Sequence, residues 1–185
     1  VALIQIIPHF DLITYNAALL FLVSGLGFFA ICQRIRKLTI YSGVFVLCFA
    51  SLSTAQYLFG IQLGIDQLLM NDFLSANEIS PGRMSFSTAI SFFCIGLYLC
   101  LLFVRMPLFI KPTLSATIFS LAFIGFIEHL MKVDMSSGWA MYRQMEVQTS
   151  FAFCIAAMII MLKVIVSLVS STSLRYLISA LTIGG

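Results

Sequence analysis

The sequence predicts an all-α integral membrane protein, and three observations predict it. Of the 185 residues, 61% are hydrophobic and only 9% are charged, whereas soluble domains carry about 25% charged residues. The mean hydropathy is +1.09. Apolar runs long enough to cross a bilayer, which takes about 20 residues, recur along the chain. These values exclude soluble and disordered classes, and a net charge of +3 is too small for a nucleic-acid-binding surface.

Five apolar runs define the expected transmembrane helices. They cover about residues 12–33, 38–60, 85–104, 112–133 and 147–170. Residues 176–185 are apolar but too short to span, so we expect them to form a separate C-terminal helical fragment. Residues 1–185 are interpreted as a single transmembrane domain. Because the chain starts at Val1 rather than Met, we expect it to be a fragment of a longer protein.

The charges divide the connections between these spans into two sets. One set holds seven basic residues and no acid: Arg34, Arg36, Lys37, Arg105, Lys111, Lys163 and Arg175. The other holds Asp11, Asp66, Asp72, Glu78, Asp134 and Glu146, with Arg83, Lys132 and Arg143. An excess of Lys and Arg marks the cytoplasmic side. The sequence therefore predicts a multi-pass protein with residue 1 extracytoplasmic and the C-terminus cytoplasmic, the exit that an attached internal output domain requires.

An internal repeat relates the odd-numbered spans. Residues 13–21 align with residues 84–92 at an offset of 71, and a third copy, offset by a further 61, begins at Met145. The alignment places a Phe at the same position in each copy, followed four residues later by Gly or Ala. Residues 56–58 and 128–130 align more weakly at an offset of 72. We therefore expect a bundle of repeated helix–external loop–helix units, in which small residues allow close helix packing.

Polar side chains gather near the expected outer ends of the spans. Gln56, Tyr57, Glu128 and His129 lie at the ends of the even spans, and Thr14, Asn16, Ser87, Thr88, Gln148 and Thr149 lie at the starts of the odd ones. Ionisable groups at membrane depth usually face the bundle interior or a water-filled cavity. One interpretation is an outward-opening ligand pocket, and the other is interhelical hydrogen bonding near the interface.

The longest external loop adds two candidates, Asp66 and Arg83, to these polar residues. Arg83 follows the Pro81–Gly82 turn and is expected to pair with Asp66 or Asp72, or to bind an anionic ligand; a solvated loop is the alternative. The candidate ligand-binding set is therefore Gln56, Tyr57, Asp66, Arg83, Thr88, Glu128 and His129.

The chain offers no recognisable catalytic constellation. The five cysteines lie in apolar runs with no paired spacing, and the sequence has no zinc signature or Gly-rich phosphate loop. No cofactor or metal is predicted. His129 is a weak candidate haem ligand, because His9, the other histidine, precedes the first span.

Residues 56–69, the segment Pro81-Gly82-Arg83-Met84-Ser85 and the pair Thr88-Ala89 carry a resemblance to a known region. Together they resemble the multi-helix membrane sensory region of bacterial PAS-containing histidine kinases and GGDEF diguanylate cyclases. Pro8 to Gly27 resembles a helix start of the same region, so the resemblance covers about Pro8 to Met158. Its positions here are Gln56, Tyr57, Asp66, Arg83, Met84 and Thr88, and the chain departs at Ser87, where Asn is frequent.

The resemblance implies a sensory domain in the bacterial inner membrane. Such a domain detects an extracytoplasmic or lipophilic signal and relays it through its last helix to a cytoplasmic output. Any kinase or cyclase activity would then lie beyond residue 185. The expected partners are the lipid bilayer and a second copy of the chain or other subunits of a membrane complex. The alternative is a non-catalytic, cofactor-holding subunit of such a complex. A transporter is a third hypothesis, disfavoured because the ionisable residues gather at the outer edge rather than the midplane.

Overall fold

A computed structural model describes residues 14–61, 64, 83–104, 107, 109–131 and 145–183, with side chains described up to residue 169. This part of the chain forms five α-helices. They are α1 (Tyr15–Cys32), α2 (Arg36–Phe59), α3 (Phe86–Leu101), α4 (Ile110–Leu130) and α5 (Val147–Ile183). The expected all-α fold is therefore confirmed.

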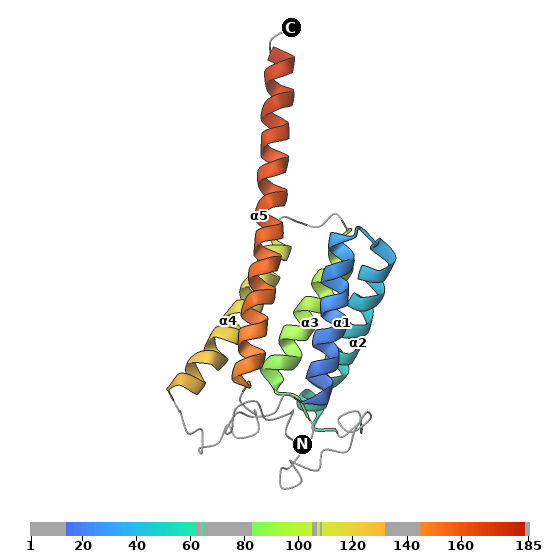
Figure 1. The fold of residues 1–185 in the computed structure, drawn as a ribbon, viewed down its shortest axis with the longest axis vertical. Helices are drawn as coiled ribbons and strands as arrows, with labels where there is room; N and C mark the ends of the chain where they lie inside the picture. The colour runs from blue at the N-terminus through green and yellow to red at the C-terminus, as the bar shows by residue number, and fades with distance from the viewer. Residues whose placement is uncertain are drawn as a thin grey trace.

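The helices run side by side in alternating directions (Figure 1). The starts of α1, α3 and α5 lie at one end of the bundle, here called the acidic end after the acidic connections predicted there. The other end, with Arg34, Arg36, Lys37 and Lys111, is called the basic end. α3 packs mainly on α2 and also on α4 and α1, while α5 packs mainly on α4. α3 therefore lies at the centre of the bundle.

Four of the five expected spans are long and apolar enough to cross a membrane. They are Tyr15–Cys32, Arg36–Phe59, Ile110–Leu130 and Val147–Val169. Their outward side chains are apolar, as lipid contact requires, with Leu22, Leu58 and Phe151 all more than half exposed. The expected span 85–104 forms the 16-residue α3, about 24 Å long against a hydrocarbon layer of about 30 Å. This helix is instead buried by its neighbours along most of its length.

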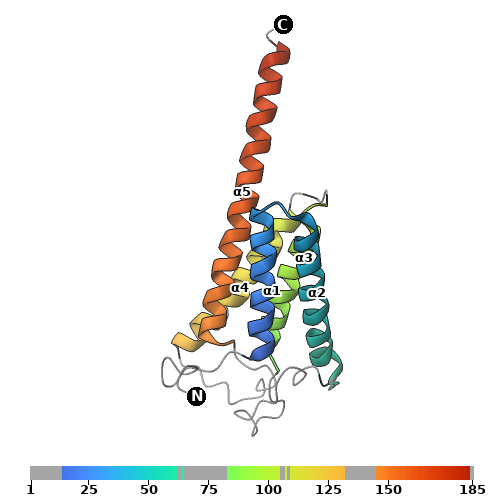
Figure 2. The same ribbon diagram turned by 45° about the vertical axis from the view of Figure 1, so that its right-hand side comes forward.

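The expected break before residue 176 is wrong. α5 is one helix of 37 residues, Val147–Ile183, about 55 Å long. It extends well past the other helices at the basic end (Figures 1 and 2). The polar residues between 170 and 175 lower the hydropathy, but they include no Gly or Pro that would stop a helix. A loss of hydropathy ends a membrane span without ending the helix.

The external loops expected in the repeat units lie mainly outside the described residues, which include only residue 64 between 62 and 82 and none of residues 132–144. α1 and α2, and likewise α3 and α4, are joined at the basic end. The first junction is a Schellman motif, in which the N–H of Ile35 donates to the Ala30 carbonyl at 2.9 Å and that of Arg34 to Ile31 at 3.2 Å. Arg34 takes the left-handed conformation, with φ 58°. The turn is tight enough that no loop is needed.

Small residues allow α2 and α3 to approach closely. A Cβ added to Gly96 of α3 would lie 2.6 Å from the backbone nitrogen of Leu47 on α2. One added to Gly43 of α2 would lie 2.8 Å from the Leu99 Cβ. Close backbone contact at small residues is the usual way in which membrane helices associate.

Two basic side chains from neighbouring helices contact the basic end of α3. The Lys111 ammonium donates to the Leu102 carbonyl at 3.1 Å, which satisfies a carbonyl at the C-terminus of the helix. The Arg36 guanidinium lies 5.3 Å from the centroid of the Phe103 ring, within cation–π range. The basic residues that predict orientation therefore also join neighbouring helices.

Candidate functional site

Three helix starts come together at the acidic end, and the repeat places matching residues there. Thr14, Ser85 and Glu146 each precede the first residue of α1, α3 and α5. The Ser85 hydroxyl accepts from the backbone N–H of Thr88 at 3.2 Å, and its oxygen lies 2.7 Å from the Thr88 hydroxyl. At the start of α5, the Thr149 hydroxyl donates to a Glu146 carboxylate oxygen at 2.9 Å. In these two repeats, the residue before the helix thus forms a side-chain contact with the third residue of the helix, Thr88 or Thr149.

The first repeat lacks this arrangement. Ala17 occupies the position that Thr88 and Thr149 hold in the other repeats. The Thr14 hydroxyl is buried, and within the described part of the chain it has no hydrogen-bond partner. The Ser150 hydroxyl, on the first turn of α5, is also buried and has no hydrogen-bond partner among the described residues. An unsatisfied buried hydroxyl carries a desolvation cost, which a water or a polar ligand can offset.

An aromatic triad lies beneath these helix starts. The ring centroids of Phe21, Phe92 and Phe153 are 4.8 Å (Phe21–Phe92), 4.9 Å (Phe21–Phe153) and 4.8 Å (Phe92–Phe153) apart. Each Phe follows the first residue of its helix by six positions, about 9 Å along the axis. The triad forms an apolar layer below the polar helix starts.

Tyr57 joins the end of α2 to the start of α3. Its hydroxyl donates to the Met84 carbonyl at 2.6 Å, and its ring meets Phe86 edge-on with centroids 5.5 Å apart. The Arg83 guanidinium lies 5.4 Å from the centroid of the Tyr57 ring. The structure therefore brings two candidate residues, Tyr57 and Arg83, into contact. Gln56, the preceding residue on α2, is fully buried.

The remaining candidates lie elsewhere. Glu128, half-buried, and His129, exposed, are near the end of α4, which packs on α5 and α3. Tyr57 belongs to α2, which packs on α3 and α1. α3 thus separates the two groups within the bundle (Figure 1). Asp66 lies outside the described residues.

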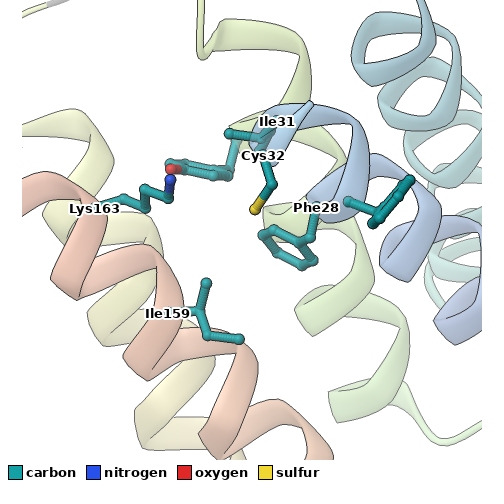
Figure 3. Close-up of a pocket in the computed structure, with 7 residues that line it drawn as sticks. Phe28, Ile31, Cys32, Ile159 and Lys163 are labelled. Atoms are coloured by element: carbon teal, nitrogen blue, oxygen red, sulfur yellow. The ribbon is translucent and has the colours of Figure 1, made fainter. Parts of the chain in front are cut away.

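Two features have no counterpart among the sequence-based candidates. The Ser115 hydroxyl of α4 donates to the Ala157 carbonyl of α5 at 2.7 Å; a lone serine in an apolar run gives little sign of such a bond. A cavity of about 180 Å³ lies between α1, α3 and α5 (Figure 3). Lys163 lines it, although the sequence places that residue only near the inner interface.

The side chains at the acidic end can form hydrogen bonds and charge interactions. Among residues 14–61, 64, 83–104, 107, 109–131 and 145–183, no three His, Cys, Asp or Glu side chains are grouped as metal ligands would be. The candidate haem ligand His129 is exposed near the end of α4. The acidic end combines hydroxyls, an amide, a guanidinium and three helix N-termini, whose partial positive charge favours anionic or hydrogen-bonding ligands.

A scan against protein-family models finds no matching family, and searches of curated proteins and of solved structures find no match. The fold itself defines the class: a helical bundle with four candidate membrane-spanning helices, as in a multi-pass membrane protein.

Proposed function

We propose that this chain is the membrane-embedded sensory domain of a bacterial signal-transduction protein. A signal from the extracytoplasmic space, or a lipophilic one from the bilayer, acts at the polar acidic end. α5 then relays the change to an output domain on the basic, cytoplasmic side. The resemblance of residues 56–69, 81–85 and 88–89 to bacterial sensory regions supports this proposal, as does the distribution of basic residues.

The continuity of α5 is the observation that carries the proposal. The helix begins among the polar helix starts, with Thr149 bonded to Glu146. It then passes the whole bundle and projects beyond it at the basic end (Figures 1 and 2). A single helix behaves as a stiff rod, so a shift, tilt or rotation at its start reaches its far end.

The way α5 is held suits such a movement. Its main interface is with α4, where the Ser115 hydroxyl bonds to the Ala157 carbonyl near the middle of the candidate span Val147–Val169. Near its start, Phe153 contacts Phe21 and Phe92. A ligand that alters the packing of the helix starts therefore acts on the aromatic triad directly. In a homodimer, the projecting segments of two copies would move against each other.

A fusion series tests this relay. Residues 1–185 are joined to a diguanylate cyclase output domain through zero to four inserted alanines, and cyclase activity is measured in membranes. A helical relay predicts activity that rises and falls with the 3.6-residue helical period. A flexible Gly–Ser linker is the control and should abolish the dependence. Equal activity across the alanine series contradicts the proposal.

Substitution at the start of α5 tests the polar end as the input. Thr149→Val in the active fusion removes the hydroxyl bonded to Glu146 and is expected to shift basal cyclase activity at least threefold. Thr117→Val, at a half-buried side chain whose hydroxyl bonds to the Thr113 carbonyl within α4, is the matched control and should leave the activity unchanged. If the two variants behave alike, the acidic end is not coupled to the output.

A further inference from the structure

The cavity between α1, α3 and α5 has the size and walls of an apolar binding pocket. Its volume is about 180 Å³, slightly more than the roughly 150 Å³ of an apolar cavity that admits benzene. Phe28 and Ile31 of α1 and Ile159 of α5 provide apolar walls (Figure 3). Tyr98 of the central helix α3 closes the inner side, and its ring lies 6.5 Å from that of Phe28. The pocket can hold part of an acyl chain.

The pocket is apolar at one end and charged at the other. α1 and α5 both run from the acidic to the basic end, so Phe28 and Ile159 lie deeper than Cys32 and Lys163. The Lys163 side chain reaches from α5 across the pocket toward α1 (Figure 3). Among the described residues that line the pocket, Lys163 is the only charged one.

The depth of Lys163 matches the lipid headgroup level. It lies 16 residues after Val147 at the start of α5, or about 24 Å along the helix axis. The hydrocarbon layer is about 30 Å thick, and a lysine side chain near its edge extends toward the headgroups. At this depth we expect its ammonium to be within reach of the lipid phosphates of the basic-side leaflet, with the apolar part of the pocket below it.

We propose that this pocket binds an anionic phospholipid from the basic-side leaflet. The phosphate contacts the Lys163 ammonium, and a segment of one acyl chain lies between Phe28 and Ile159. The positive charge of Lys163 suits the anionic headgroup, and the apolar walls on the side away from Lys163 suit the acyl chain. The site stands independently of the sensory function, although a lipid here separates α1 from α5.

Native mass spectrometry of the detergent-purified protein tests the site, with phosphatidylglycerol and phosphatidylcholine as the two probes. One phosphatidylglycerol is expected to bind more tightly than phosphatidylcholine. Lys163→Gln should weaken its binding about fivefold, the effect of one basic residue near an anionic headgroup. Lys37→Gln removes an exposed lysine at the same end and should change binding less than twofold. Equal effects of the two substitutions, or equal binding of the two lipids, would overturn the proposal.

A second variant separates pocket binding from general attraction to a basic surface. Ile159→Trp fills the pocket while keeping Lys163, and because Ile159 is 41% exposed the larger ring can be accommodated. It should weaken phosphatidylglycerol binding at least fivefold with an unchanged melting temperature. Undiminished binding would overturn the site.

Protection of Cys32 offers an independent readout. Cys32 lines the pocket near the basic end of α1. Phosphatidylglycerol should slow maleimide modification of Cys32 relative to its rate in detergent alone, and phosphatidylcholine should not. Identical rates in the two lipids would count against the assignment.

Discussion

Phe21 of α1 and Phe153 of α5 lie with their ring centroids 4.9 Å apart, although these two helices pack mainly on α2 and α4 respectively. Phe92 of α3 completes the triad at 4.8 Å from each. The three residues occupy one position of the internal repeat, six residues after the start of each helix. The repeat thus brings equivalent residues together at nearly equal distances at the centre of the bundle.

Phe153→Ala is expected to destabilise the bundle by about 1–3 kcal/mol, because it removes two ring contacts worth about 0.5–1.5 kcal/mol each. Phe151→Ala is the matched control, since the Phe151 side chain is 61% exposed and should cost less than about 0.5 kcal/mol. Reversible unfolding in mixed micelles measures both variants. Equal destabilisation by the two variants would show that the triad adds nothing specific.

Gly25 and Gly96 occupy equivalent repeat positions in different surroundings. Gly96→Ala would place a Cβ 2.6 Å from the Leu47 nitrogen, so we expect a loss of about 1–3 kcal/mol from overpacking. A Cβ at Gly25 meets nothing within 4 Å, so Gly25→Ala should be neutral or should stabilise the helix by up to about 1 kcal/mol. Thermal unfolding of the two variants checks the contrast, and a tolerated Gly96→Ala would contradict the close α2–α3 packing.

Much of the fold could be predicted from composition and periodicity. Apolar runs mark the helices because lipid contact requires apolar side chains wherever a helix faces the bilayer. The repeat alignment at Phe21, Phe92 and Phe153 anticipates equivalent positions that the structure shows in mutual contact. The limits of α5 could not be predicted this way, because hydropathy reports where a helix leaves the membrane and not where it ends.

The candidate site could be predicted only in part. Tyr57 and Arg83 lie together because α2 and α3 meet at their acidic ends. Glu128 and His129 lie near the same end of the bundle as Tyr57 and Arg83, but the position of a residue along its helix does not reveal which helices are neighbours. The pocket at Lys163 is formed by side chains from three helices, α1, α3 and α5, so no local sequence pattern predicts it.

Tyr57→Phe tests the α2–α3 junction. The substitution keeps the ring beside Phe86 and Arg83 but removes the hydroxyl that donates to the Met84 carbonyl at 2.6 Å. A loss of about 0.5–1.5 kcal/mol in the free energy of unfolding is expected. Tyr41→Phe, at a side chain that is 69% exposed, is the control and should have little effect. A loss no greater than that of the control would mean that this hydrogen bond does not stabilise the junction.

Ser115 and Ser150 are both buried on the α4–α5 side of the bundle and should respond in opposite ways to substitution by alanine. The Ser115 hydroxyl joins α4 to the Ala157 carbonyl of α5, and interhelical bonds of this kind in membranes contribute about 0.6 kcal/mol on average and up to about 1.7 kcal/mol. Ser115→Ala should therefore destabilise the protein by that order.

The Ser150 hydroxyl has no hydrogen-bond partner within the described residues, and it lies where a Cβ on Gly125 would approach it to 2.9 Å. Ser150→Ala removes a buried polar atom, so unfolding should require the same or slightly more free energy. Measured in one detergent, the changes in the free energy of unfolding caused by Ser115→Ala and Ser150→Ala should have opposite signs. Destabilisation by Ser150→Ala would instead reveal a water or ligand bound to that hydroxyl at the start of α5, beside the residues proposed to receive the signal.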